Sequence, residues 1–203
     1  MSTKKILLTI AILSCCMSSQ AQAGFGIKGG LSASWIPGTV INGDEVVSPH
    51  NSFYAGGFAN WELGDILLLQ TELLYAGKGH SDRSRLLNEK YSRDLGYLQL
   101  PVFVGMRIAD DRCGIMLGPE LGYLVYANTR DYDGSRKDSR DECNPFNFAI
   151  ALQAAYMITD GLGIEIKADW GLTRTFKGAY LGVADDPGHN MSFQIGLCYR
   201  FED

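Results

Sequence analysis

The chain has 203 residues, a formal net charge of −5, and 24 glycines against 6 prolines. This length suits one domain, and the small acidic excess, with no basic tail or stripe, gives no support for nucleic-acid binding. Beyond the N-terminal region, no run of about 18 apolar residues occurs, which excludes a membrane-spanning helix there. Frequent aromatic residues and glycines with few prolines are typical of twisted strands.

The first 23 residues have the organisation of a secretory signal peptide. Two lysines at 4–5 precede an apolar run over 6–13, and Ala21-Gln22-Ala23 forms a small-residue cleavage motif before Gly24. We therefore predict a signal peptide over 1–23 and a mature domain over 24–203.

A lipoprotein signal is the alternative interpretation of this region. In that case Cys15, after Ile12-Leu13-Ser14, would carry the lipid anchor. However, Leu13 is bulky at a position where such motifs usually have a small residue, so simple cleavage is favoured.

The mature chain consists of runs in which apolar residues alternate with polar or small residues. There are eight such runs, at 24–36, 53–63, 66–77, 95–108, 113–127, 146–158, 162–176 and 190–201. Their connections alternate in length: 64–65, 109–112 and 159–161 are short, whereas 37–52, 78–94, 128–145 and 177–189 are long and polar. An even number of strands with short turns at one end and long loops at the other is typical of outer-membrane β-barrels.

Neighbouring positions of a strand point to opposite faces, so each run can be divided by parity. One parity is apolar, as in Leu98, Leu100, Val102, Val104 and Met106. The opposite parity carries amides, glycines and charged side chains. Those charged residues are Lys28, Glu62, Glu72, Arg107, Glu120, Glu165, Lys167, Asp169 and Arg200. Because buried charges require partners, we predict that they form an ion-pair network that fills the lumen.

Parity alone does not say which face points inward. A soluble eight-stranded barrel would have apolar residues inside and polar residues outside. The export signal, the alternating loop lengths and the outward aromatic residues near strand ends favour the membrane barrel. We therefore predict an all-β fold: an eight-stranded antiparallel transmembrane β-barrel with short periplasmic turns and long extracellular loops, in the outer membrane of a Gram-negative bacterium.

Five segments together resemble the outer-membrane β-barrel domain family known as the porin family, which is similar to PorT-like barrels and more distantly to OmpA and OmpX. They are Gly26-Ile27-Lys28-Gly29-Gly30-Leu31, Gln70-Thr71-Glu72-Leu73-Leu74-Tyr75, Tyr97-Leu98-Gln99-Leu100-Pro101-Val102, Gly118-Pro119-Glu120-Leu121-Gly122 and Tyr199-Arg200-Phe201. The resemblance implies insertion by the barrel assembly machinery, guided by the C-terminal aromatic strand, and no particular activity. Such barrels commonly end on an aromatic residue, whereas Glu202 and Asp203 follow Phe201 here.

No catalytic or metal site emerges from the loops. His50, His80 and His189 fall in long loops, but no spacing connects them as metal ligands or acid–base groups. The segment 131–142 has acids at the first, third and twelfth positions of a calcium loop, but Arg136 occupies the sixth position, where glycine is required. We therefore predict no enzymatic activity, no metal and no cofactor.

The mature chain retains three cysteines, and we predict that no two of them form an intramolecular disulfide. The topology places Cys113 near the periplasmic rim, Cys143 in an outer loop and Cys198 on the lumenal face. A disulfide requires Cα atoms about 4.4 to 6.8 Å apart, whereas the membrane core is roughly 30 Å thick.

These features favour a structural or interaction protein with a plugged lumen, embedded in outer-membrane lipid. Its extracellular loops would contact an unknown protein or surface ligand. A small-solute pore is one alternative, although eight strands leave an interior only wide enough for side chains. An accessory subunit of a secretion or envelope machine, as the resemblance to PorT-like barrels implies, is the other.

Overall fold

The computed structural model describes residues 23–36, 40–41, 44–45, 49–83, 90–108, 112–130, 135–177 and 188–201. Most of the predicted signal peptide, the lipidation alternative at Cys15 and part of the calcium-like segment lie outside these ranges. Within them, no helix is both long and apolar enough to cross a membrane.

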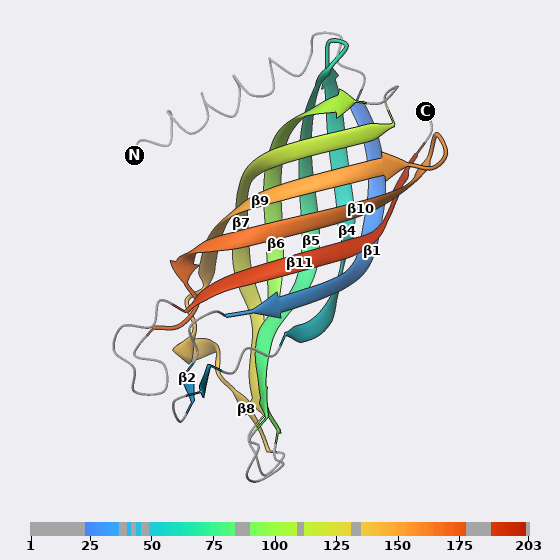
Figure 1. Ribbon diagram of the computed structural model, residues 1–203. Coiled ribbons are helices and arrows are strands. Elements are labelled where there is room, and N and C mark those ends of the chain that lie inside the picture. The colour runs from blue at the N-terminus through green and yellow to red at the C-terminus, as the bar shows by residue number, and fades with distance from the viewer. Residues whose placement is uncertain are drawn as a thin grey trace, which may run out of the picture.

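Eight long antiparallel strands form a closed barrel, as predicted (Figure 1). They follow one another around the wall in the order β6-β5-β4-β1-β11-β10-β9-β7, and pairing of β6 with β7 closes the ring. The first and last of these strands are neighbours, with Ile27 opposite Tyr199 and Trp35 opposite Met191. Their bounds are β1 Ala23–Trp35, β4 His50–Leu63, β5 Leu67–Arg83, β6 Lys90–Ile108, β7 Cys113–Arg130, β9 Phe146–Met157, β10 Leu162–Arg174 and β11 His189–Arg200.

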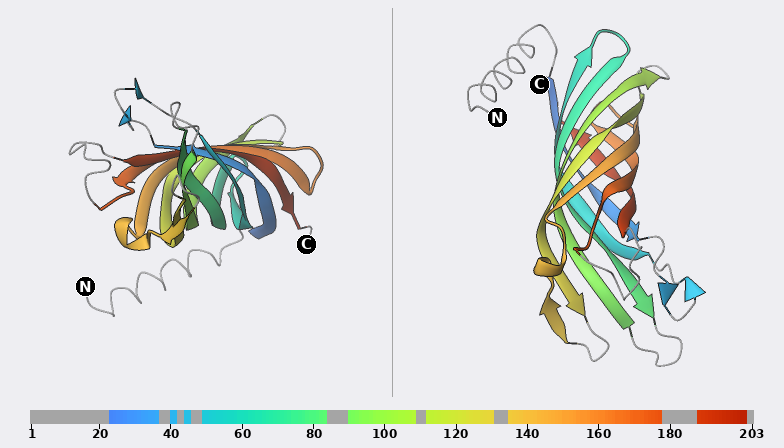
Figure 2. Two further views of the ribbon diagram at one scale, coloured as in Figure 1. Left: turned by 90° about the horizontal axis from the view of Figure 1, so that it is seen from below. Right: turned by 90° about the vertical axis from the view of Figure 1, so that its left-hand side faces the viewer.

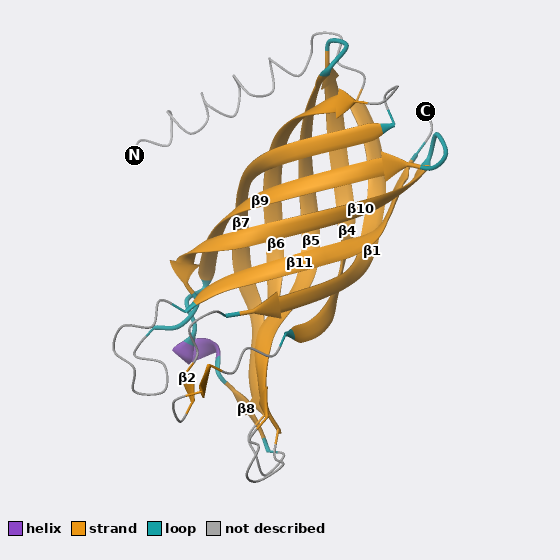
Figure 3. Ribbon diagram, in the orientation of Figure 1, coloured by secondary structure: helices purple, strands orange, loops and turns teal. Residues whose placement is uncertain are grey.

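The short elements gather at the end of the barrel that carries the long loops (Figure 3). They are β2 Val40–Ile41, β3 Asp44–Glu45, β8 Arg136–Asp138 and the 3-10 helix η1 Arg140–Glu142. β1 begins and β11 ends at the opposite end, with the short turns. Because barrels of this kind have short turns in the periplasm and long loops outside, the end with the short elements is extracellular.

Four strands, β4, β5, β6 and β7, extend three or more residues beyond the predicted runs, and these ends lie on the extracellular side of the barrel (Figure 2). The prediction of a loop over 78–94 was wrong at both of its ends, because the β5–β6 ladder continues from Gly77 opposite Gly96 to Arg83 opposite Lys90. Likewise, β7 continues to Arg130 and pairs there with β8. Outside the membrane both faces of a sheet can contact water, so these segments lack the alternation that revealed the other strands.

The apolar parity faces outward, as predicted. Along β6, Leu98, Leu100 and Val102 are exposed, whereas Gln99 and Phe103 are buried. The exposed apolar band covers every long strand and forms the surface that contacts outer-membrane lipid.

At two positions the structure favours glycine over residues with a side chain, once because of the backbone conformation and once because of a neighbouring ring. Gly64 has φ 77° in the turn between β4 and β5, a conformation that L-residues rarely adopt. Gly196 of β11 lies under the hydroxyl of Tyr54, and a Cβ at this position would collide with that hydroxyl. The missing side chain therefore lets the Tyr54 ring cross the lumen toward β10.

Candidate functional site in the barrel lumen

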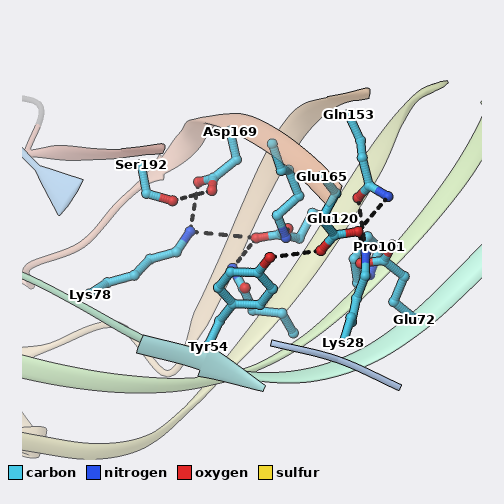
Figure 4. A network of polar contacts seen from close by, with 12 residues as sticks. Lys28, Tyr54, Glu72, Lys78, Pro101, Glu120, Gln153, Glu165, Asp169 and Ser192 are labelled. Carbon is cyan, nitrogen blue, oxygen red and sulfur yellow. Dashed lines mark hydrogen bonds and ion pairs between the residues drawn. The ribbon is translucent and has the colours of Figure 1, made fainter. Parts of the chain in front are cut away.

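Seven buried charged side chains meet in the middle of the lumen (Figure 4). The strands bring together residues up to 141 positions apart in sequence (Lys28 to Asp169), because alternate positions of each strand point inward. We call this group the central cluster, and it consists of Lys28, Glu72, Lys78, Glu120, Glu165, Lys167 and Asp169.

Lys28 organises the half of the central cluster nearer the periplasm. Its Nζ lies 2.6 Å from Glu72 Oε1 and 2.6 Å from Glu165 Oε2. The same ammonium donates a hydrogen bond to Gln153 Oε1 at 3.2 Å. Tyr54 completes this half by donating its hydroxyl to Glu165 Oε1 at 2.7 Å.

Lys78 and Lys167 organise the half nearer the extracellular side. Lys78 Nζ lies 2.6 Å from Asp169 Oδ1 and 3.5 Å from Glu120 Oε1, and Lys167 Nζ lies 2.9 Å from Glu120 Oε2. Glu120 thus receives two ammonium groups from opposite sides of the barrel, one from β5 and one from β10.

Every carboxylate of the central cluster also accepts a hydrogen bond from a neutral donor. Gln70 donates to Glu72 at 2.6 Å, and Gln99 donates to Glu120. In the same way, Tyr54 donates to Glu165, and Ser192 donates to Asp169. Desolvated ions are tolerated when such additional hydrogen bonds accompany the ion pair, so this arrangement compensates for burial.

The predicted charge network is therefore divided, and its membership differs from the prediction. Glu62 and Arg107 form a separate, partly exposed pair at the periplasmic rim, 2.8 Å apart. Arg200 donates to the carbonyl oxygen of Asp160 at 3.1 Å in the adjacent turn. Lys78, by contrast, lies in the predicted loop 78–94, but the structure places it in β5 and in the central cluster.

A recess leads from the periplasmic end of the lumen to the central cluster. It contains about 580 Å³ of space outside protein atoms, including the part open to solvent. Arg107, Arg112 and Arg200 surround its mouth, and Lys28, Gln153 and Glu165 lie among its deeper lining residues. Solutes from the periplasm can thus approach the central cluster from one side.

A buried apolar group lies at the extracellular end of the lumen, and we call it the extracellular cap. Its buried members are Ile36, Leu95, Tyr97, Leu124, Ala127, Cys143 and Phe176. Arg93 covers it from outside: its guanidinium lies 4.8 Å from the centre of the Phe176 ring and 2.6 Å from Glu142 Oε2. The backbones of Cys143 and Phe176 pair in a single antiparallel β-bridge, which joins the segment after η1 to the segment after β10.

Solvated charges surround the extracellular cap. Lys137 lies 3.6 Å from Glu142, and the guanidinium of Arg140 lies 3.0 Å from Asp138. The backbone N–H and the guanidinium of Arg140 hold the pKa of Asp138 below its usual value. This part of the protein has both signs of charge intermixed on an exposed surface.

The two histidines whose side chains are described lie at the starts of β4 and β11. His50 Nε2 lies 3.4 Å from Asp94 Oδ1 and His50 Nδ1 lies 3.4 Å from Ser81 Oγ, whereas His189 is at the start of β11. The side chain of His80 lies outside the described part. No group of three potential His, Cys, Asp or Glu ligands occurs among the described residues.

The described cysteines occupy three separate environments. Cys113 begins β7 at the periplasmic end, Cys143 is buried in the extracellular cap, and Cys198 is buried on the lumenal side of β11. These places agree with the positions expected from the sequence.

Two solved structures share this architecture. The attachment invasion locus protein Ail of Yersinia pestis, in complex with the heparin analogue sucrose octasulfate, is 13% identical over 89% of this chain and 99% of that chain, with a TM-score of 0.51. Neisserial surface protein A is 11% identical over 89% of this chain and 99% of that chain, with a TM-score of 0.59. At these identities the likeness concerns the fold alone.

Sequence comparison identifies the family. No curated protein sequence matches the chain. The profile of the outer membrane protein β-barrel domain matches residues 18–177, which is most of the chain. The chain therefore belongs to the outer membrane protein β-barrel family and spans the outer membrane of a Gram-negative bacterium.

Proposed function

We propose that this chain is a structural or interaction protein whose closed barrel anchors an extracellular surface. The observation that carries the proposal is the buried central cluster. Three ammonium groups and four carboxylates from four strands, β1, β5, β7 and β10, occupy the cross-section that a solute would need. The extracellular cap lies above the cluster, which supports a second barrier in series.

The extracellular ends of β5, β6 and β7, together with β8 and η1, would supply the contact surface. All three residues of β8 are exposed, and both signs of charge lie around them. Exposed mixed charges on strands fixed by a barrel suit a protein or a charged surface ligand. Because Ail was crystallised with sucrose octasulfate, a sulfated glycan is one ligand class to test.

Site-specific photocrosslinking in whole cells tests this proposal. A photoreactive residue at position 137, which is exposed on β8, is compared with one at Asp65 in the periplasmic turn between β4 and β5. We expect discrete adducts with a partner at position 137, which differ from those at position 65. The interaction role would be contradicted by the same set of adducts, or by none, at both positions.

A small-solute pore is the second candidate, and the periplasmic recess favours it. The recess already extends to Lys28 and Glu165. To form a continuous pore, the remaining side chains of the central cluster and those of the extracellular cap would have to move aside. A pore predicts ionic current through the unmodified protein, whereas the interaction role predicts none.

The proposal also includes the route to the membrane. Cleavage after Ala23 would leave Gly24 as the first residue, and the barrel assembly machinery would insert the strands. We assign no catalytic activity and no resident cofactor to the chain. An accessory role in an envelope machine would use the same extracellular surface or the periplasmic rim.

A further inference from the structure

Two sulfur atoms from different strands converge on Gly163 at the lumenal face of β10. Gly163 is the register partner of both Met157 on β9 and Cys198 on β11. A Cβ built on Gly163 would lie 2.8 Å from Met157 Sδ and 3.0 Å from Cys198 Sγ. The two sulfur atoms therefore cannot be farther apart than the sum of these distances, 5.8 Å.

Both sulfur side chains line the periplasmic recess. The recess opens at the periplasmic end of the lumen, whereas the extracellular cap lies at the opposite end. Gly163 leaves the space beside the two sulfur atoms without a side chain. A small ion can therefore reach both sulfur atoms from the periplasm.

The chemistry of the pair selects soft metal ions. Thiolate and thioether sulfur favour Cu(I) and similar ions over hard cations. With metal–sulfur bonds of about 2.3 Å, a two-coordinate ion needs sulfur atoms roughly 4.6 Å apart, which the 5.8 Å limit permits. Glu165, the carboxylate of the central cluster that lines the recess, is already held by Lys28 and Tyr54.

We propose that Cys198 and Met157 form a binding site for a soft monovalent metal ion, Cu(I) or Ag(I), that enters from the periplasm. On binding, the S–H bond of Cys198 breaks, the proton leaves to water, and metal–sulfur bonds form to Cys198 and Met157. No electron is transferred. Since one proton is exchanged for one monovalent ion, the net charge of the site stays the same, and Lys28 and Arg200 do not oppose the bound state.

Metal titration of the full mature protein in detergent tests the site. Ag(I) and, under anaerobic conditions, Cu(I) are titrated in competition with a chromophoric chelator, and folding of each variant is checked by circular dichroism. We expect one tightly bound equivalent in the unmodified protein, loss of that equivalent in Cys198→Ser, and affinity weaker by about tenfold or more in Met157→Leu. X-ray absorption of the Cu(I) form should show two sulfur neighbours.

Two matched variants separate this site from general sulfur binding. Cys113→Ser removes the thiol at the periplasmic end of β7, and Met191→Leu removes a thioether on the outward face of β11. Both should bind like the unmodified protein. The proposal is overturned if Cys198→Ser retains the equivalent, if Cys113→Ser loses it, or if Met157→Leu binds with unchanged affinity. If Cys198→Ser fails to fold, absence of two sulfur neighbours in the absorption spectrum of the unmodified protein overturns it.

Discussion

Lys78 Nζ lies 2.6 Å from Asp169 Oδ1 across the lumen, and both side chains are fully buried. Lys78 is the first residue of β5 beyond the predicted run 66–77, and Asp169 lies in β10. Ser192 donates to the other carboxylate oxygen of Asp169, so the pair is anchored on three strands. This pair lies between the rest of the central cluster and the extracellular cap.

Replacing Lys78 with Met should destabilise the barrel strongly. The substitution leaves the buried Asp169 carboxylate without its cation, which costs about 3 to 5 kcal/mol in the free energy of unfolding. Urea unfolding in lipid vesicles measures this loss. Lys137→Met is the matched control: Lys137 is 75% exposed beside Glu142, so the change should stay within about 1 kcal/mol. Equal losses in the two variants would contradict the burial argument.

The double variant Lys78→Met with Asp169→Leu tests whether the cost comes from an unpaired charge. Removal of both partners leaves fewer uncompensated ions, so the double variant should lose less stability than the two single variants added together. The same unfolding assay gives the three values. Additive losses would mean that the two side chains do not act as a pair.

The sequence predicts a member of the central cluster only where apolar and polar residues alternate regularly. Glu72, Glu120 and Asp169 lie within regular runs, so parity placed them inside. Lys78 follows Ala76-Gly77, where the outward apolar residues stop, and its segment therefore resembled a polar loop. Only the continued β5–β6 ladder, with Lys78 opposite Leu95, brings it into the lumen.

Thr71→Val should destabilise the wall of the barrel modestly. Thr71 donates its hydroxyl to the carbonyl oxygen of Pro101 at 3.3 Å. Because Pro101 has no backbone N–H, it cannot donate a hydrogen bond to the neighbouring strand. Loss of this bond should cost about 0.5 to 1.5 kcal/mol. Thr175→Val is the control, because Thr175 Oγ1 has no hydrogen-bond partner within the described ranges, and this change should be neutral or stabilising. The prediction fails if both variants unfold at the same urea concentration.

The cysteine of the extracellular cap reports whether this cap stays closed. Burial raises the pKa of Cys143, so less thiolate is present at a given pH, and maleimide labelling should rise only at higher pH than for an ordinary thiol of pKa about 8.5. Phe176→Ala opens the apolar contact and should increase labelling at neutral pH. Mass mapping of the labelled peptide measures the rate.

Phe146→Ala is the control for this experiment. Phe146 is 58% exposed on the outward face at the extracellular start of β9, so its removal should leave labelling of Cys143 unchanged. Fast labelling of Cys143 in the unmodified protein would contradict a closed cap.

Parity grouped nine charged residues on one face of the strands but could not separate those at its centre from those at its rim. Arg107 and Arg200 lie near the periplasmic ends of β6 and β11, where their long side chains meet Glu62 and the Asp160 carbonyl instead of the central cluster. Depth along the axis depends on strand tilt and on the register between neighbours, which a single sequence does not give. The contribution of Tyr54 was missed for another reason: it is a neutral donor and carried no charge signal.

The mature protein should begin at Gly24 and carry no lipid. The Ala21-Gln22-Ala23 motif predicts cleavage after Ala23, which is also the first residue of β1. The intact mass of protein purified from outer membranes, with sequencing of its N-terminal peptide, decides this. A diacylated Cys15 at the N-terminus would establish the lipoprotein alternative instead.

Conductance across a planar lipid bilayer tests the closed lumen most directly. We propose that the paired side chains of the central cluster fill the cross-section and that the extracellular cap closes one mouth, so the unmodified protein should insert without ionic current. A porin inserted in the same bilayer provides the positive control for the assay. Absence of current from protein that is shown by labelling to be inserted is the predicted result, and sustained ohmic single-channel current would contradict it.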